Sequence, residues 1–222
     1  MSKIEDQRRL GEGVKSWNAW AEEQLKLAPA KRAHVNLSGW GLPGLDLTGI
    51  IFPGNTTFES TNMGEAANFT CARFHGDVTF NSAQFPLGAS FKDAQFDGAV
   101  RFTATNFDSQ SSGNDEVDFR GANFKGKAQF QSFASRKPVT FADAVFEKQV
   151  NFHGSRFDQC AIFNKVRFAD VVTFDNSVFS DVSFANATAT AQAYFQGVQF
   201  NGQTFFEGAS MQDDSRFVGA VF

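Results

Sequence analysis

Phenylalanine recurs along the chain in steps that alternate between five and six residues. Between residues 141 and 179 the series is Phe141, Phe146, Phe152, Phe157, Phe163, Phe168, Phe174 and Phe179. A pattern that returns every eleven residues matches neither the 3.6-residue period of a helix nor the alternation of a strand, so it indicates a stacked repeat. The series continues on both sides of this stretch. We therefore predict one elongated repeat domain.

A second position in the repeat is also constrained. The residue two positions before each central ring is small or β-branched, as in Ala67, Ala72, Val78 and Ala83. Residues two apart on an extended segment point to the same side. We therefore expect both positions to face the interior, with the rings of one coil stacked on those of the next.

The register is interrupted at three places. Phe107 and Phe119 are twelve residues apart, and the intervening DSQSSGNDEVD is rich in turn formers, which predicts a protruding loop over residues 108–118. Ser135 stands where a central ring is expected, and Thr190 or a neighbour replaces another.

The N-terminal segment, up to His34, follows a different pattern. Val14, Trp17, Ala21 and Leu25 lie on one face of a predicted helix that stops before Pro29, and a shorter helix is expected ahead of Gly11. We divide the chain into a helical cap, residues 1–34, and a repeat domain of about nine coils, residues 35–222.

The first repeats have the form of pentapeptides: VNLSG, WGLPG, LDLTG and IIFPG. Together with ANF at Ala67–Phe69 and Ala122–Phe124, they resemble the pentapeptide-repeat family. The resemblance implies an all-β fold, a right-handed quadrilateral parallel β-helix, in which four pentapeptides form the four faces of one coil. The WNAW segment at Trp17–Trp20 is similar to the N-terminal caps of such proteins, so the fold class includes an N-terminal α-helical cap.

Composition limits the function. The net charge of −4 gives no electrostatic case for direct nucleic-acid binding. No apolar window is long enough for a signal peptide core or a membrane segment. The cysteines, Cys71 and Cys160, are expected to be free thiols packed near corners, which suits a reducing compartment. We predict a cytoplasmic protein.

The chain shows no catalytic, cofactor-binding or metal-binding motif. Its three histidines, His34, His75 and His153, have no metal-ligand spacing, and the last two are expected on different faces. We predict that the protein is not an enzyme and needs no cofactor.

Polar residues that precede successive central rings suggest a docking strip. Asn62, Gln84, Asn106, Gln129, Asn151 and Thr173 recur once per predicted coil and are expected on one face. Stacked amides can hydrogen-bond to one another, so the strip is either a structural ladder or a surface for a partner. Ser111, Asn114, Asp115 and Glu116 in the predicted loop are the other candidate partner-binding residues.

These observations favour a non-enzymatic interaction solenoid that binds a protein through a lateral face, the loop or an open C-terminal end, where an end-to-end homodimer could form. The family resemblance implies an alternative, a DNA-mimicking modulator of DNA gyrase or topoisomerase. Such mimicry needs aligned acidic residues. The residues that follow the rings, such as Glu59, Asn81, Thr103, Lys125 and Glu147, have mixed signs, which disfavours it.

Overall fold

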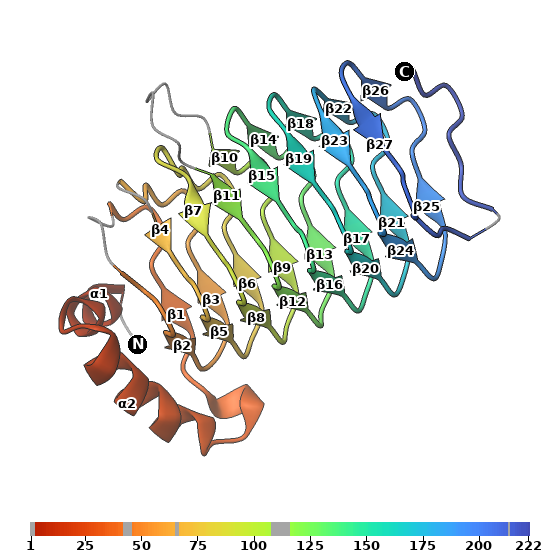
Figure 1. Cartoon of the computed structure of the whole chain (residues 1–222). Helices are drawn as coiled ribbons and strands as arrows, with labels where there is room; N and C mark the ends of the chain where they lie inside the picture. The colour runs from red at the N-terminus through yellow and green to blue at the C-terminus, as the bar shows by residue number, and fades with distance from the viewer. Residues whose placement is uncertain (1–2, 42–45, 65–66, 108–115, 213) are drawn as a thin grey trace.

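The computed structural model describes residues 3–41, 46–64, 67–107, 116–212 and 214–222. In this part of the chain, short parallel strands stack into a four-sided β-solenoid, and two α-helices, α1 (Lys3–Gly11) and α2 (Val14–Leu25), cover its N-terminal end (Figure 1). A short 3-10 helix, η1 (Pro29–Lys31), leads into the first coil. The predicted fold class, a parallel β-helix with a helical N-terminal cap, is confirmed.

Each side of the solenoid is one parallel sheet, and we name the four sides faces A to D in the order in which the chain visits them. Face A contains β1 (Val35–Asn36), β3 (Thr56–Thr57), β6 (Val78–Thr79), β9 (Val100–Arg101), β13 (Ala128–Gln129), β17 (Val150–Asn151), β21 (Val172–Thr173) and β25 (Ala193–Tyr194). Face B contains β10 (Asn106–Phe107), β14 (Ala134–Ser135), β18 (Arg156–Phe157), β22 (Val178–Phe179) and β26 (Gln199–Phe200).

Faces C and D have the same construction. Face C contains β4 (Ala67–Asn68), β7 (Ala89–Ser90), β11 (Val117–Asp118), β15 (Val139–Thr140), β19 (Ala161–Ile162), β23 (Val182–Ser183) and β27 (Thr204–Phe205). Face D contains β2 (Ile51–Phe52), β5 (Arg73–Phe74), β8 (Gln95–Phe96), β12 (Asn123–Phe124), β16 (Val145–Phe146), β20 (Arg167–Phe168) and β24 (Thr188–Ala189). The described strands make about seven turns, and isolated bridges such as Tyr194 to Arg216 continue the ladders. The division at residue 34 and the count of nine coils stay predictions.

The strand register shows where the loop lies. Successive coils near the N-terminal end have the same length, since Thr56 pairs with Val78, and Val78 pairs with Val100. The coil that contains the loop is longer, because Val100 pairs with Ala128, whereas a step of the ordinary length would reach Ala122. The additional residues fall in sequence between β10 on face B and β11 on face C, so the order of the faces is unchanged. Residues 108–115 of the predicted loop lie outside the described residues.

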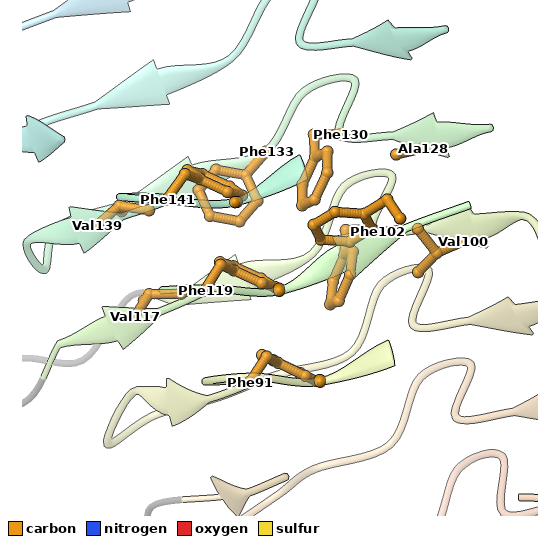
Figure 2. Packing of buried hydrophobic residues seen from close by; sticks show 14 of the residues in the cluster. Phe91, Val100, Phe102, Val117, Phe119, Ala128, Phe130, Phe133, Val139 and Phe141 are labelled. Atoms are coloured by element: carbon orange, nitrogen blue, oxygen red, sulfur yellow. The ribbon is translucent and has the colours of Figure 1, made fainter. Parts of the chain in front are cut away.

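The interior is a stack of phenylalanine rings (Figure 2). Phe119 is fully buried, and its ring centroid lies 4.9 Å from that of Phe91 and 4.7 Å from that of Phe141, with the planes nearly parallel. The ring of Phe102, on the adjacent face, meets it edge-on at 5.4 Å. Both arrangements are favourable for aromatic pairs. The predicted inward position of the central rings is therefore confirmed.

In one coil, the buried ring on face B does not come from the central position of the repeat. Ser135 occupies the central position on face B, as predicted, and pairs with Phe107 and Phe157 in the ladder. The missing ring is supplied by Phe133, two positions earlier, which is fully buried and lies 5.0 Å from Phe107 and 5.5 Å from Phe157. In the other interrupted coil, Ala189 takes the central position opposite Phe168.

The cysteines do not pack as expected. Cys71 and Cys160 are free but exposed. Cys71 occupies a turn position with φ of 58°, in the left-handed region. Ser60, Ser82 and Asp93 occupy equivalent turns with similar φ values. The expectation of packed thiols was wrong. The turn position directs the Cys71 side chain away from the core, and Cys160 directly precedes the buried Ala161 of β19, so its side chain alternates to the outside.

The helical cap replaces the hydrogen bonds that a preceding coil would provide. The Trp17 indole N–H donates to the Ile51 carbonyl at 2.7 Å. The Asn18 amide donates to the Gly49 carbonyl at 2.9 Å and accepts from the Ile51 N–H at 2.9 Å. In the same way the Asp6 carboxylate accepts from the Asn36 N–H at 3.0 Å. The edges of the first coil on faces A and D are thereby satisfied, which removes the hazard of an exposed strand edge.

The hydrogen bond to Asp6 requires a carboxylate to be buried, which disfavours its charged form. The side chain is buried, and its Oδ1 atom has no hydrogen-bond partner in the described structure. Burial raises the pKa of Asp6, although the Asn36 N–H and the charges of the N-terminus and Arg9 act in the opposite direction. The folded state therefore binds the proton more tightly than the unfolded state does, where an aspartate has a pKa of about 3.9.

We expect Asp6→Asn to increase the free energy of unfolding at pH 7. An asparagine Oδ1 can still accept from the Asn36 N–H, and no charge has to be buried. The advantage over the wild type should be complete above the raised folded pKa, should shrink as the pH falls from that pKa toward the unfolded value of about 3.9, and should be lost below it. Urea denaturation of both proteins between pH 3 and 8 measures the difference. A variant that is less stable than the wild type at pH 7 would contradict this assignment.

Candidate partner-binding face

The predicted strip of polar residues is divided between two faces. Asn62, Gln84 and Asn106 align on face B. Asn106 then pairs with Ala134, whereas Gln129 pairs with Arg101 and Asn151 on face A. The prediction of one continuous strip was wrong. Its spacing counted the residues between Phe107 and Phe119 as containing a face of the coil, but β10 on face B is followed in the chain by β11 on face C.

Face A is the longest uninterrupted sheet in the described structure, with eight strands in register. The outward residues of its strands are polar along the whole ladder: Asn36, Thr57, Thr79, Arg101, Gln129, Asn151, Thr173 and Tyr194. The alternate residues are buried valines, threonine and alanines. Two of the predicted partner-binding residues, Gln129 and Asn151, therefore lie at the centre of this face. The additional residues lie in sequence between a strand of face B and a strand of face C, so none of them interrupts the strand ladder of face A.

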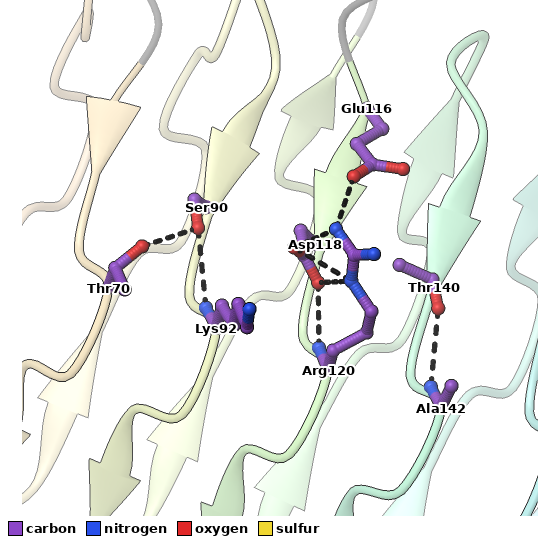
Figure 3. A network of polar contacts seen from close by, with 8 residues as sticks. All are labelled: Thr70, Ser90, Lys92, Glu116, Asp118, Arg120, Thr140 and Ala142. Carbon is purple, nitrogen blue, oxygen red and sulfur yellow. Dashed lines mark hydrogen bonds and ion pairs between the residues drawn. The ribbon is translucent and has the colours of Figure 1, made fainter.

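The base of the loop is held by an ion-pair cluster on face C. Ser111, Asn114 and Asp115 lie outside the described residues. Glu116 lies inside them and accepts from Arg120 at 2.7 Å (Figure 3).

The same arginine is bound to a second carboxylate. Arg120 also contacts Asp118 at 2.6 Å, and Asp118 is almost fully buried. Hydrogen bonds and the charge of Asp118 raise the pKa of Arg120. This geometry gives Glu116 a structural role in fixing the chain where it re-enters the solenoid.

Face D has a ladder of alternating charge. His75 Nδ1 lies 2.7 Å from Asp97 Oδ2, and Lys125 donates to Asp97 Oδ1 at 2.8 Å. Burial acts to raise the pKa of Asp97, but Lys125 and His75 outweigh it and lower that pKa. Lys125 therefore belongs to face D, whereas Glu59, Asn81 and Thr103 lie on face A, so the predicted column of these residues also crossed the loop wrongly. The corrected column on face D still has mixed signs.

Comparison with protein families agrees with this architecture. A family profile described as pentapeptide repeats (9 copies) matches residues 45–107 and 152–199, which together are half of the chain. The chain is a pentapeptide-repeat protein.

One solved structure is similar to this chain at low sequence identity. Among solved structures, this pentapeptide-repeat protein is similar to trypsin-treated QnrB1, a plasmid-mediated fluoroquinolone resistance protein, with 15% sequence identity and a TM-score of 0.43. The similarity covers 80% of this chain and 90% of that chain. No curated protein matches the sequence. Neither of the α-helices in the described part of the repeat protein is long and apolar enough to cross a membrane.

Two hollows flank the corner between faces D and A near the N-terminal end of the pentapeptide repeats. One, of about 380 Å³, lies over face A and is bordered by His34, Asn55, Asp77 and Arg101. The other, of about 340 Å³, lies on the face D side, and both His34 and His75 are among its lining residues. The sequence did not predict that these two histidines border one hollow, because His34 precedes the first coil. His153 lies on face A, far along the chain from both, as expected.

These hollows do not form a metal site. Among the residues that the structure describes, no group of three or more His, Cys, Asp or Glu side chains could hold a metal ion.

The C-terminal coil of the repeat protein exposes apolar side chains: Phe217, Val218, Val221 and Phe222. The rings of Phe217 and Phe222 stack on Phe195 and Phe200 at 4.5 and 4.8 Å. A contact between two copies at this coil stays a prediction.

Proposed function

We propose that this protein is a non-enzymatic, cytoplasmic interaction module that binds a protein partner along face A. The observation that carries the proposal is the continuity of that face, which presents eight strands in register and a polar outer surface. Buried rings fill the described interior, so recognition has to come from the outer side chains. The free cysteines support the cytoplasmic assignment.

A rigid sheet face suits protein binding. Its backbone groups are engaged between coils, as in the 2.7 Å bond from the Phe102 N–H to the Gln129 carbonyl. Side chains such as Gln129 and Asn151 are therefore held at fixed spacing by the backbone beneath them. Preorganised contact groups lose less entropy on binding than mobile ones do.

Site-specific photocrosslinking in extracts of the source cells tests the proposal. A photoreactive residue at Thr103, which follows Phe102 on face A, should yield an adduct with one discrete protein. The matched control is Ala142, which follows Phe141 in the equivalent position on face C. Adducts of equal yield at both positions, or none at Thr103, would overturn the assignment of face A.

The alternative, a DNA-mimicking modulator of gyrase, requires a continuous acidic stripe. The described charges are instead interleaved, as in His75, Asp97 and Lys125 on face D. An assay of DNA supercoiling by gyrase separates the two functions. Inhibition at stoichiometric concentrations would replace the partner-binding proposal with mimicry.

A further inference from the structure

Three basic residues lie along one edge of face A in successive coils. Arg101 is in β9, Lys127 directly precedes β13, and Lys148 precedes β17 by two positions. These strands are consecutive in the sheet, and the Val100 N–H donates to the Lys127 carbonyl at 2.9 Å. Adjacent strands are about 4.8 Å apart, so the three positions span roughly two strand spacings.

None of the three has an ion-pair or hydrogen-bond partner for its side chain among the described residues. Arg101 is half-buried and borders the 380 Å³ hollow, whereas Lys127 and Lys148 are exposed. Elsewhere in the described structure, Lys125, Arg120 and Arg156 each contact a carboxylate, whereas Arg73, Lys92 and Arg167 are exposed without such a contact. The edge of face A differs from these places because three such bases follow one another in consecutive coils.

The outward residues between the three bases are uncharged, and carboxylates lie at the borders. The other outward residues in the same three coils are Ala99, Thr103, Gln129, Gln131, Gln149, Asn151 and His153. Glu147 directly precedes Lys148, and Asp170 holds the position of Lys148 in the next coil, because Val150 pairs with Val172. Asp77, Asp170 and Asp175 accept hydrogen bonds from the Ala99, Val171 and Gln196 N–H groups. We name Arg101, Lys127, Lys148, Gln129 and Asn151 the basic patch.

We propose that the basic patch binds an acidic segment of the protein partner, so that the partner's carboxylates lie on Arg101, Lys127 and Lys148. This inference rests on the proposed function and specifies the chemistry of the partner. The Asn151 Oδ1 accepts from the His153 N–H at 2.8 Å, which leaves its amide N–H₂ directed to donate. Amide donors beside the cations can bind carboxylate or main-chain oxygens.

The charge of the whole protein adds specificity. The net charge of −4 disfavours an acidic partner for the protein as a whole, so the basic patch is the place where such a partner gains attraction. Like-charge repulsion suppresses wrong binding modes, and a complementary patch fixes the register. A nucleic acid is a poorer fit, because proteins that bind duplex DNA typically neutralise about 6–10 phosphates. The patch offers three cations on a negatively charged body.

A short polyglutamate peptide is the probe, and its binding is measured by fluorescence anisotropy at several salt concentrations. The test variant is Arg101→Glu/Lys127→Glu/Lys148→Glu. The control, Arg73→Glu/Lys92→Glu/Arg167→Glu, makes the same change in net charge at exposed positions on faces C and D. We expect the test variant to lose about tenfold or more in affinity and the control to stay within about twofold. Wild-type affinity should fall as salt rises.

Three results would overturn the inference: no binding of polyglutamate at low salt, equal losses in the test and control variants, or tighter binding of a short DNA duplex than of polyglutamate. Should the test variant not fold, as judged by its circular dichroism, Arg101→Gln/Lys127→Gln/Lys148→Gln replaces it with the same expected direction. Failure of the proposed function gives a different result. If no crosslink forms at Thr103, the partner does not bind face A, and the proposed function is wrong. If the crosslink forms and persists in the charge-reversed test variant, only the inference of an acidic segment is wrong.

Discussion

Replacing Phe130 with alanine is expected to lower the free energy of unfolding by about 3–5 kcal/mol, the range for deleting a buried aromatic ring. Phe130 is fully buried. Its ring stacks on Phe102 at 5.0 Å and on Phe152 at 4.8 Å, and it meets Phe141 edge-on at 5.4 Å. The strands of the coils on either side are held in place by backbone hydrogen bonds, so they cannot move in to fill the cavity that Phe130→Ala would leave. We therefore expect a cost in the upper part of this range.

Phe205→Ala is the matched control. Phe205 is also a phenylalanine of the solenoid and lies in β27. Its side chain points outward, and the residue is 51% exposed. Its replacement should cost less than about 1 kcal/mol. Urea denaturation followed by circular dichroism compares the two variants with the wild type. Similar costs at both positions would show that burial in the stack does not control stability.

The sequence alone was sufficient to predict most of the interior. The five-six alternation of phenylalanine places rings such as Phe119 and Phe141 directly above one another, because each coil returns the chain to the same face. The helical cap was also predictable, since Trp17 and Ala21 form one apolar face and both are buried against the first coil. Hydrophobic periodicity encodes these features directly.

The outer surface could not be predicted as well, because it depends on the register across the loop. Gln129 follows Asn106 by a sequence separation close to that of one ordinary coil, yet the two lie on different faces. Apart from Val117, which lies in β11 on the same face as Phe119, the residues between Phe107 and Phe119 contain no apolar position that shows whether a further face lies between them. The six additional residues shift every later column by one face relative to a count by spacing, so the alignment of Arg101 with Gln129 became visible only in the structure.

The cap contacts were hidden for a different reason. Asn18 carries no pattern that indicates its role, and its two bonds to the first coil depend on how α2 packs against the end of the solenoid beside β2. The position of His34 and His75 at one hollow likewise depends on the path of the chain after η1. Contacts between segments that are far apart in sequence are specified by packing, which local periodicity does not report.

In one coil Phe133 supplies the ring that the central residue, Ser135, lacks. Replacing Phe133 is the second change that we expect to lower the free energy of unfolding strongly. Phe133→Ala should cost about 3–4 kcal/mol, because it removes the ring that packs between Phe107 and Phe157 and leaves Ser135 with a cavity. Ser135→Phe alone should also destabilise the protein, by about 1–3 kcal/mol, because two rings would compete for one space. The serine hydroxyl also bonds the backbone of Lys137, and these bonds would be lost.

Combining the two changes should restore stability. Phe133→Ala/Ser135→Phe places a small residue two before the centre and phenylalanine at the centre, as Thr105 and Phe107 or Ser155 and Phe157 do in the neighbouring coils. Its cost should be lower than that of Phe133→Ala by about 1 kcal/mol or more, so the two effects couple favourably in a double-mutant cycle. Measuring all three variants by urea denaturation decides the point. Additive costs would mean that the two side chains do not share one volume, and that the serine at the centre is tolerated for a reason other than the ring beside it.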